Sequence, residues 1–466
     1  RVSTATNLPD DLQKVKPLWT LPLGTHQYSI PTVAGDELFV TTNDLRFDRP
    51  GTKSTGGGLL LCVDRATGKP KWRFRSPRFK EGTVDPYHYD QWECGFASGP
   101  VVDGDRVYLV GNRGEILCLD RKGQANGNDG PFVEEAQYMQ LQPGEGEALR
   151  PDDGDLIWRY DLVKELDVVP HDVCGSTLLM CGNLLYATTS NGIDGAHKTV
   201  PHPDAPSLIV LDKRTGRLVA RDGELIGRRM LHGHWSSSVY GEVNGQGRIF
   251  FGGGDGVLYA FEPAREDVAE VQTLKKVWMY DCNPESYRVK NGQPVTYSSS
   301  GKNTPEGPSE IIGTPVFFEN RVYAVLGQSP LHGPGQGNLV CVDAATGQPV
   351  WTSNRVNRSL ATVSIADGLL YVVDCVGELF CFDAKSGDLV WSQNLEGKVW
   401  SASTFVADGK VYAGTETNQV WVLKAGREKQ VLSRTRVGAM PITPTAVDGV
   451  LYLPTQTQLI AWPGGK

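Results

Sequence analysis

Short apolar runs separated by polar turns recur along the whole chain. Eight times a turn rich in Gly, Asp or Asn leads into a strand-like run with an aromatic residue, as in VDGDRVYLV and ADGLLYVV. The copies begin near residues 34, 103, 181, 244, 318, 366, 407 and 447. Short alternating runs with turn signals roughly every 8–12 residues are typical of all-β proteins. The pattern therefore predicts an all-β chain made of eight similar units.

A second repeated phrase, Asp-x-x-Thr/Ser-Gly-x-x-x-Trp, follows the first. It reads DRATGKPKW at 64–72, DAATGQPVW at 343–351 and DAKSGDLVW at 383–391. The copy at 212–220, DKRTGRLVA, has Ala220 in place of the tryptophan. The Asp and Thr side chains can bond turn amides, and the glycine supplies the backbone freedom of a tight turn. We expect the tryptophan to lie in a fourth strand and to pack against the next sheet.

Four short strands in each of eight units predict a single eight-bladed β-propeller over residues 1–466. The last unit ends after QLIAWPG without a fourth strand, whereas KPLWTLPLG at 16–24 is an unpaired strand at the other end of the chain. We expect this N-terminal strand to complete the last blade, because closure removes free sheet edges. The expected blades cover approximately 25–80, 92–161, 171–222, 232–282, 310–354, 358–394, 398–436, and 439–466 together with 16–24.

These repeats closely resemble those of the quinoprotein-like (PQQ-like repeat) propeller family. The family includes the pyrroloquinoline quinone (PQQ) dehydrogenases and the propeller lipoprotein of outer-membrane protein assembly. The resemblance is carried by the Trp-containing phrase and covers essentially the whole chain. It implies an eight-bladed fold and a periplasmic or secreted location. The start at Arg1-Val2-Ser3, without a signal peptide, fits a mature or trimmed secreted chain as well as a cytosolic one. It implies no single activity, because the family mixes enzymes with scaffolds.

Composition limits the partners that we expect. The net charge of −8 gives no general attraction to phosphate backbones, so nucleic acid is not an expected partner. No apolar run approaches the ~18 residues that span a membrane. Four of the nine cysteines alternate with apolar residues, as in LLCVD and LFCFD, and are expected to behave as small buried hydrophobes. The acidic, glycine-rich insertion 123–153 is expected to form an exposed loop that can dock a protein partner.

All eight histidines map to loops on one face of the expected propeller. His171 and His232 precede the inner strands of adjacent units, so both are expected to point towards the central funnel. The segment GQSPLHGPGQG is placed to bring Gln328 and His332 over the same funnel. Three imidazoles and an oxygen donor predict a site for a divalent metal such as zinc, manganese or calcium. His234 is expected to face a neighbouring blade.

Other residues at the same mouth suggest a ligand. Arg358 is placed to hold an anionic group such as a carboxylate, and a histidine or Tyr240 to act as general acid or base. Aromatic faces beside imidazoles and carboxylates are typical of sugar-binding sites, and Trp92, Trp235 and Trp400 precede inner strands; packing against a neighbouring blade is the alternative role. Further charged residues that map to this mouth are Glu93, Asp172, Asp255, Asp374, Lys398 and Glu416.

Three functions remain open at this point. The first is a metal-assisted lyase or hydrolase that acts on a carbohydrate in the funnel, with His171, His232, Tyr240 and Arg358 as the expected catalytic residues. The second is a non-catalytic binding or assembly scaffold. The third is a PQQ-dependent alcohol or sugar dehydrogenase. The resemblance implies adjacent cysteines in such dehydrogenases, and this chain has none, so PQQ is a less expected cofactor than a divalent metal.

Overall fold

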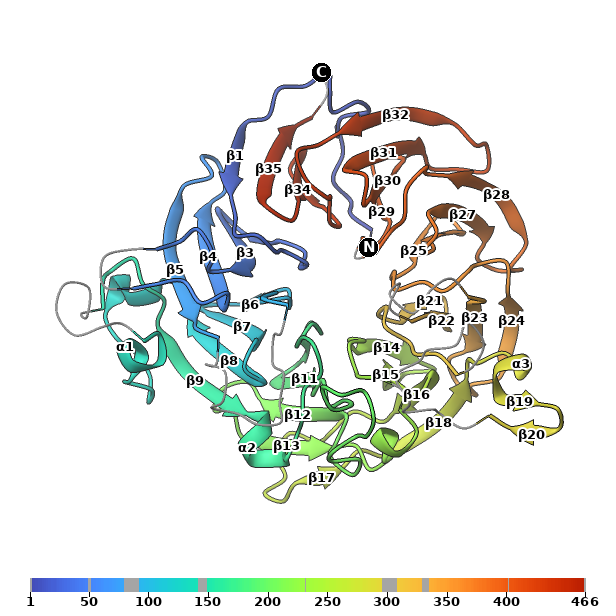
Figure 1. Ribbon diagram of the computed structural model, residues 1–466, viewed down its shortest axis with the longest axis horizontal. Coiled ribbons are helices and arrows are strands. Elements are labelled where there is room, and N and C mark those ends of the chain that lie inside the picture. The colour runs from blue at the N-terminus through green and yellow to red at the C-terminus, as the bar shows by residue number, and fades with distance from the viewer. Residues whose placement is uncertain are drawn as a thin grey trace.

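The chain folds into a ring of eight antiparallel β-sheets around a central axis (Figure 1). The structure is a computed structural model that describes residues 2–48, 52–78, 92–140, 149–230, 232–295, 308–328, 335–400 and 402–464. In each sheet the chain runs from the innermost strand outwards, except for the last strand of the eighth. The eight-bladed propeller predicted from the repeats is confirmed.

The first four blades contain short inner strands and longer middle strands. Blade 1 is β2 (Thr32–Ala34), β3 (Glu37–Asn43), β4 (Gly58–Asp64) and β5 (Pro70–Ser76). Blade 2 is β6 (Val101–Asp103), β7 (Arg106–Gly111), β8 (Glu115–Asp120) and β9 (Leu156–Asp161). Blade 3 is β10 (Leu179–Cys181), β11 (Leu184–Thr188), β12 (Leu208–Asp212) and β13 (Leu218–Arg221). Blade 4 is β14 (Val239–Val243), β15 (Gln246–Gly252), β16 (Val257–Phe261) and β18 (Lys276–Asp281).

The second half of the ring repeats this arrangement. Blade 5 is β21 (Val316–Phe318), β22 (Arg321–Leu326), β23 (Asn338–Asp343) and β24 (Pro349–Ser353). Blade 6 is β25 (Ser364–Ala366), β26 (Leu369–Val373), β27 (Glu378–Asp383) and β28 (Leu389–Asn394). Blade 7 is β29 (Phe405–Ala407), β30 (Lys410–Thr415), β31 (Gln419–Lys424) and β32 (Val431–Arg436). Blade 8 is β33 (Thr445–Val447), β34 (Val450–Pro454), β35 (Gln458–Pro463) and β1 (Trp19–Pro22).

Short helical turns and a small hairpin lie outside the blades. The helices are η1 (Gly123–Asn126), α1 (Glu135–Tyr138), α2 (Leu162–Leu166), η2 (Ile226–Arg228) and α3 (Glu285–Arg288), and the hairpin strands are β19 (Val289–Lys290) and β20 (Gln293–Pro294). Within the described ranges, no helix has the length and apolar character needed to cross a membrane.

The N-terminal strand closes the ring, as predicted. β1 pairs antiparallel with β35, with Trp19 opposite Ala461, so blade 8 is built from both ends of the chain (Figure 1). Ahead of β1, Leu8 and Leu12 are buried in a cluster with hydrophobic residues of blades 7 and 8. The chain before the closing strand therefore adds a second attachment between these two blades.

The repeated tryptophan joins six of the eight blades to the next one. Trp72 donates a hydrogen bond from Nε1 to the carbonyl of Arg121 at 2.8 Å, and Trp351 donates to Ala384 at 3.1 Å. A Cβ atom added at Gly387 would lie 2.5 Å from the Trp351 ring, so the Thr-Gly turn needs glycine for this contact as well as for its φ of 77°. The same hydrogen bond joins Trp19 to Arg65, Trp158 to Lys213, Trp278 to Ala344 and Trp391 to Gly426.

Blades 3 and 4 are joined differently, which explains Ala220. The connection 262–275 between the third and fourth strands of blade 4 has no Thr-Gly turn to receive a tryptophan. Instead, β17 (Gln272–Thr273) from this connection pairs in parallel with β13, with Ala220 opposite Gln272, and becomes a fifth strand of blade 3. Ala220 is completely buried there, so this position takes a small side chain.

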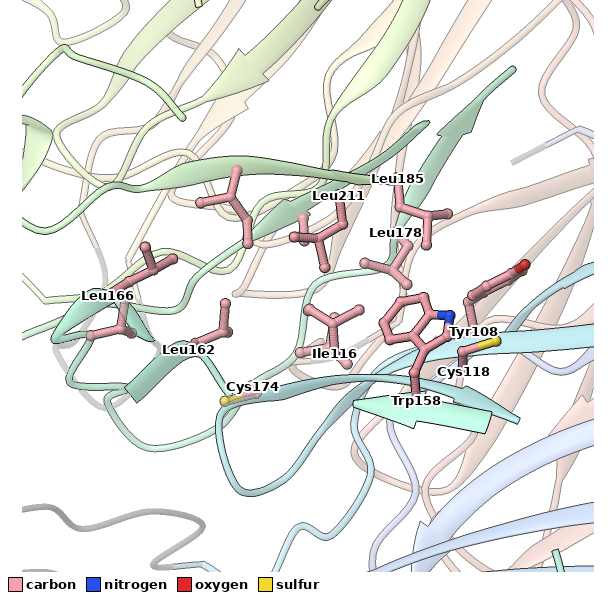
Figure 2. Packing of buried hydrophobic residues seen from close by; sticks show 14 of the residues in the cluster. Tyr108, Ile116, Cys118, Trp158, Leu162, Leu166, Cys174, Leu178, Leu185 and Leu211 are labelled. Atoms are coloured by element: carbon pink, nitrogen blue, oxygen red, sulfur yellow. The ribbon is translucent and has the colours of Figure 1, made fainter. Parts of the chain in front are cut away.

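Hydrophobic cores fill the spaces between neighbouring blades. In the cluster between blades 2 and 3, Ile116 and Trp158 of blade 2 pack near Leu211 of blade 3, with Leu162 of α2 in the same cluster (Figure 2). Cys118 belongs to this cluster and is 1% exposed. The other cysteines of the repeat, Cys62, Cys341 and Cys381, are equally buried and unpaired, so their predicted role as small hydrophobes is confirmed.

Candidate metal centre

The loop after blade 2 brings His171 to the entrance of the inner strand of blade 3. Pro170 forms a β-bridge with Asn191, and the amide of His171 donates to the carbonyl of Ser190 at 3.1 Å. Nδ1 of His171 lies 2.8 Å from the carbonyl of Ile193. Because a carbonyl only accepts, Nδ1 carries the proton and Nε2 carries the lone pair. Burial lowers the pKa of His171, which favours this neutral form.

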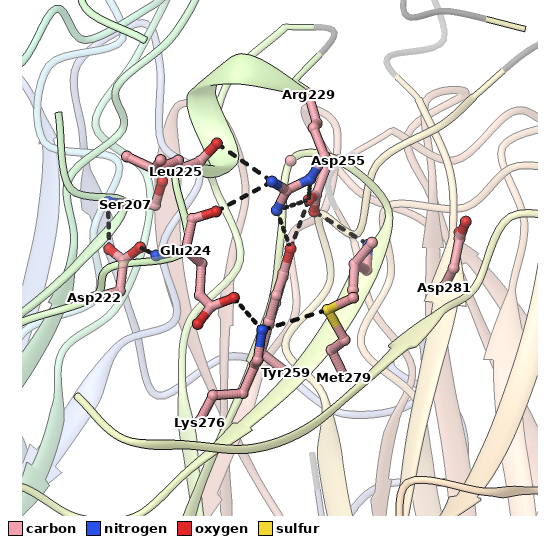
Figure 3. Close-up of polar contacts among 12 residues, drawn as sticks. Ser207, Asp222, Glu224, Leu225, Arg229, Asp255, Tyr259, Lys276, Met279 and Asp281 are labelled. Atoms are coloured by element: carbon pink, nitrogen blue, oxygen red, sulfur yellow. Dashed lines mark hydrogen bonds and ion pairs between the residues drawn. The ribbon is translucent and has the colours of Figure 1, made fainter. Parts of the chain in front are cut away.

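A polar network with buried members Asp255 and Tyr259 holds the segment that leads to His232 (Figure 3). Arg229 donates to the carboxylate of Asp255 at 3.1 Å and to the hydroxyl of Tyr259 at 2.8 Å. The Tyr259 hydroxyl in turn donates to Asp255 at 2.6 Å. Burial raises the pKa of Asp255 to about 6, while the Tyr259 hydroxyl and the Arg229 guanidinium oppose this rise. The network fixes the backbone to blade 4 three residues before His232.

Close packing of two loops fixes His171 relative to His232. The amide of Ile193 donates to the carbonyl of His232 at 2.8 Å. A Cβ atom at Gly192 would lie 2.5 Å from Cβ of His171 and 2.7 Å from the carbonyl oxygen of His232. Position 192 therefore requires glycine, because any side chain would push these two loops apart.

A third imidazole comes from the insertion 191–206 in blade 3. Asp194 accepts hydrogen bonds from the amide of Lys198 and the hydroxyl of Thr199, both at 2.8 Å. The amide of His197 donates to the carbonyl of Asp194 at 2.9 Å, and His197 has a left-handed φ of 53°. This tight turn brings the His197 ring against His171, edge to face, with 4.7 Å between ring centroids.

The three imidazoles converge on one point. Nε2 of His232 lies 2.9 Å from Nε2 of His171 and 3.2 Å from Nε2 of His197, and one ring nitrogen from each of the three lies within 4.8 Å of the others. Around a metal with bonds to nitrogen of about 2.1 Å, neighbouring nitrogens are about 3.0 Å apart at right angles and about 3.4 Å apart in a tetrahedron. The two separations from His232 match such a coordination sphere. The residues present therefore fit a metal ion.

Asp172 adds an oxygen donor to the three histidines, which we call the His triad. Its carboxylate lies 3.4 Å from Nε2 of His171 and 4.0 Å from Nε2 of His232. The side chain of Asp172 is 25% exposed, whereas those of His171 and His232 are 3% and 6% exposed, so the centre opens to solvent on the Asp172 side. Nitrogen-rich donors favour zinc or manganese over calcium, which takes oxygen ligands.

Trp235 and Glu310 flank the His triad. The Trp235 ring lies edge to face with His232 at 5.1 Å, and its Nε1 donates to the carbonyl of Val173 at 2.9 Å. On another side of the ring, a carboxyl oxygen of Glu310 lies 3.9 Å from Nδ1 of His232. Arg358 in turn is buried near Glu310, and opposes the rise in the pKa of Glu310 that burial causes.

The structure brings together some of the residues predicted as metal ligands. His171 and His232 lie side by side, as expected. The amide nitrogen of Gln328, another predicted ligand, instead donates to the carbonyl of Pro308 at 2.8 Å and to the hydroxyl of Ser309 at 3.1 Å. The predicted ligand His332 lies outside the described residues.

The residues predicted to act on a ligand are more dispersed. Tyr240, on β14, lies beside Gly247 towards the β14–β15 turn and away from the strand end that His232 precedes. Arg358 is 1% exposed, with its guanidinium 5.9 Å from the Tyr287 ring. Among the predicted aromatic residues, only Trp235 contacts the His triad in the described part of the chain, while Trp92 and Trp400 are 53% and 40% exposed.

His234, predicted from the sequence to face a neighbouring blade, contacts the neighbouring blade 3 as well as its own blade 4. Its Nδ1 accepts a hydrogen bond from the amide of Gly254 at 3.1 Å, so Nε2 donates to the hydroxyl of Ser207 at 2.9 Å. Burial lowers the pKa of His234 to about 3. This histidine joins blade 4 to the outer part of blade 3 and remains neutral.

Sequence reasoning did not assign three residues of this centre. His197 was mapped to the same face, but the fold of its insertion, which no repeat predicts, decides where its ring points. Asp172 follows His171 directly, which is a usable signal. Glu310 stands six residues before the inner strand β21 of blade 5, much as His232 precedes the inner strand β14 of blade 4. The repeat pattern alone could have indicated this equivalence.

Comparison with known proteins agrees with the fold. Residues 14–194 and 335–462, more than half of the chain, match the sequence profile of the family described as outer membrane protein assembly factor BamB. No curated protein sequence matches the chain.

Solved structures with similar folds come from both branches of the expected family. BamB from Moraxella catarrhalis aligns at 13% identity with a TM-score of 0.57, over 96% of this chain and 97% of that one. A europium-containing methanol dehydrogenase aligns at 13% identity with a TM-score of 0.62, over 99% and 96%. Quinohemoprotein alcohol dehydrogenase ADHIIG from Pseudomonas putida HK5 aligns at 12% identity with a TM-score of 0.58, over 100% and 78%. With its repeats, its eight blades and this profile match, the chain belongs to the BamB-like family of PQQ-like β-propellers.

Proposed function

We propose that this propeller is a metal-dependent enzyme of the periplasm or the secreted space, which binds an acidic carbohydrate at the funnel mouth and cleaves it as a lyase or hydrolase. The observation that carries the proposal is the convergence of His171, His197 and His232 on one point, with separations of 2.9 and 3.2 Å between Nε2 atoms. Three protein ligands and an open side are typical of catalytic rather than structural metal sites.

The donor set supports the metal role. His171, His197 and His232 would hold the ion, and Asp172 would provide an oxygen ligand or remain beside it. A bound divalent ion supplies Lewis-acid polarisation of a substrate oxygen and neutralises a carboxylate. Because the proton on Nδ1 of His171 is held by the Ile193 carbonyl, its Nε2 stays available as a ligand without any rearrangement.

The residues around the triad support an acidic sugar as the ligand. Asp172 is the most exposed charged group in contact with the triad and is placed to accept a proton from substrate or water. Trp235 offers an aromatic face beside the triad for the apolar face of a sugar ring. Arg358, which is buried near Glu310, contributes positive charge to the same region without direct access from solvent.

The first experiment is elemental analysis of the purified protein. We expect about one equivalent of zinc or manganese per chain in the wild type, and loss of the ion in His171→Ala, His197→Ala and His232→Ala. The control is His202→Ala, in the same insertion as His197, which removes a histidine outside the triad. An ion content that is unchanged in all three triad variants would refute the proposal.

The reaction class needs a second assay. Metal-loaded protein is incubated with acidic polysaccharides, and new reducing ends are measured together with the ultraviolet absorbance of unsaturated uronates. A lyase gives both signals, and a hydrolase gives reducing ends alone. Activity that survives removal of the metal, or that survives in the triad variants, would contradict a role for the metal in cleavage.

The family match favours one alternative, a binding or assembly scaffold. The matched profile is described as an outer-membrane assembly factor, and the insertion that carries η1 and α1 lies on the outside of the ring (Figure 1), where a protein partner can reach it. A scaffold role predicts that deletion of residues 124–134, which precede the buried part of α1, abolishes capture of envelope proteins, while the triad variants capture them normally. PQQ oxidation is tested by mixing the protein with PQQ and Ca²⁺, where we expect no bound quinone spectrum.

A further inference from the structure

We propose that Glu310 is a positioning residue for the metal centre, which holds His232 by Nδ1 so that Nε2 of this ring stays directed at the ion. This inference rests on the metal site proposed above. It assigns a role to a buried acidic group from a different blade, whose purpose the propeller fold itself does not explain.

Glu310 is an unusual residue for the interior of this protein. Its side chain is completely buried, and neither carboxyl oxygen has a hydrogen-bond partner among the described residues. Its backbone is fixed, because it exchanges two 2.9 Å hydrogen bonds with Gly327. A buried acceptor without a partner destabilises a fold, and a charged one does so more strongly. The fold therefore carries a destabilising group at a fixed place.

The position of this carboxyl group relates it to His232. A carboxyl oxygen lies 3.9 Å from Nδ1 of His232, on the side of the ring away from the Nε2 atoms. This distance is longer than a hydrogen bond, and such contacts at functional sites often tighten only when the site is filled. A small rotation of either side chain would bring the two atoms into hydrogen-bond range.

His171 shows the same arrangement with a different acceptor. Its Nδ1 proton is held by the carbonyl of Ile193 at 2.8 Å, and its Nε2 points into the triad. Histidines that bind metals typically donate the other ring N–H to a carbonyl or a carboxylate, which fixes the tautomer and the ring orientation. Glu310 supplies for His232 what the Ile193 carbonyl supplies for His171.

The charges of the centre agree with this role. Three neutral imidazoles carry no charge, so Asp172 and, once ionised beside a bound cation, Glu310 would balance the charge of a divalent ion. Arg358, buried next to Glu310, interacts with the Tyr287 side chain as well. Glu310 thus lies between the metal centre and a buried guanidinium, and is attracted to both.

The test compares Glu310→Gln with Glu135→Gln. Both replace a buried glutamate that has an unpartnered carboxyl oxygen, but Glu135 lies in α1, in the insertion of blade 2. Each apo protein is titrated with Zn²⁺ by calorimetry and with Co²⁺ by its visible absorption spectrum. We expect Glu310→Gln to weaken metal binding about 10- to 100-fold and to alter the Co²⁺ spectrum. We expect Glu135→Gln to leave both unchanged.

Apo stability separates positioning from a general structural role. Because the wild-type carboxyl lacks a partner, the apo Glu310→Gln protein should melt at the same temperature as wild type or higher, although it binds metal more weakly. Glu310→Asp, which keeps the charge, should recover part of the affinity. Wild-type affinity and an unchanged Co²⁺ spectrum in Glu310→Gln would refute the inference while the metal site stands. Absence of metal binding by the wild type itself would overturn both.

Discussion

Gly192→Ala is the sharpest test of how the His triad is assembled. The added Cβ would lie 2.5 Å from Cβ of His171 and 2.7 Å from the backbone oxygen of His232. Neither contact can be relieved by turning a flexible side chain, because one atom is a backbone oxygen and the other is bonded directly to the backbone. The two loops must therefore move apart, and they carry two of the three proposed ligands.

The structure gives the size of the effect. Restoring an ordinary contact of 3.4 Å from 2.5 Å needs a displacement of about 1 Å, whereas metal–ligand distances tolerate only about ±0.2 Å. Overpacking of this kind costs about 1–3 kcal/mol in folding free energy. We expect the affinity for zinc to fall by at least about tenfold, equivalent to about 1.4 kcal/mol.

The assay is calorimetric titration with zinc, together with thermal unfolding of the apo protein. Gly175→Ala is the matched control, because Gly175 lies three residues after Asp172 and a Cβ there would meet its nearest neighbour only at 3.9 Å. This control should bind zinc with wild-type affinity. Wild-type zinc affinity in Gly192→Ala, with no more loss of stability than in Gly175→Ala, would show that loop packing does not set the metal geometry.

Three further predictions concern the propeller itself. Burial raises the pKa of Asp155 to about 7, and the neighbouring Glu135 adds to the rise. The stability that the protonated Asp155 contributes is therefore present below pH 4 and is lost as the pH rises through 7. In urea unfolding, the wild type should lose about 2–3 kcal/mol more than Asp155→Asn between pH 5 and pH 8. Trp391→Phe removes the hydrogen bond to the Gly426 carbonyl and should lower the free energy of unfolding by about 1 kcal/mol in the same assay. An unchanged free energy of unfolding would show that this hydrogen bond does not stabilise the blade contact. Ala220→Trp restores the repeat but should lower the melting temperature, because Ala220 is completely buried under β17; a stabilised variant would contradict this account.

The repeat made the fold predictable to the level of individual strands. The turn-and-aromatic phrase located the first two strands of every blade, and the Thr-Gly phrase located the tryptophan strands of blades 1, 5 and 6. The reason is physical, since each blade solves the same packing problem with the same residues, as in the contacts of Trp72 with Arg121 and of Trp351 with Ala384. Closure by β1 was predictable because one strand was missing at one end of the chain and one was surplus at the other.

The site was predictable only where it follows the repeat. His171 and His232 stand at equivalent entrances of adjacent blades, so topology alone brought them together. The position of His197 depends on one left-handed turn braced by Asp194, in an insertion that occurs once, and no pattern in the rest of the chain predicts that turn. The register of such a loop is set by its own hydrogen bonds, which sequence reasoning does not resolve.

The places where this chain departs from its own repeat are the most informative about function. The tryptophan clamp is replaced at Ala220, and the connection after β16 leaves its own blade to add β17 to blade 3. The ion pair between the exposed Arg229 and the buried Asp255 lies at this same junction of blades 3 and 4, and so do two of the three imidazoles of the His triad on the funnel side. The tryptophan contact found at six blade junctions of the described chain is absent here, and it is also absent between blades 7 and 8, where Ser433 of β32 stands at the equivalent position. Natural sequences violate their local rules mainly at functional sites, and it is the converging histidines beside Ala220, rather than the missing tryptophan alone, that mark this junction as the place to look for chemistry.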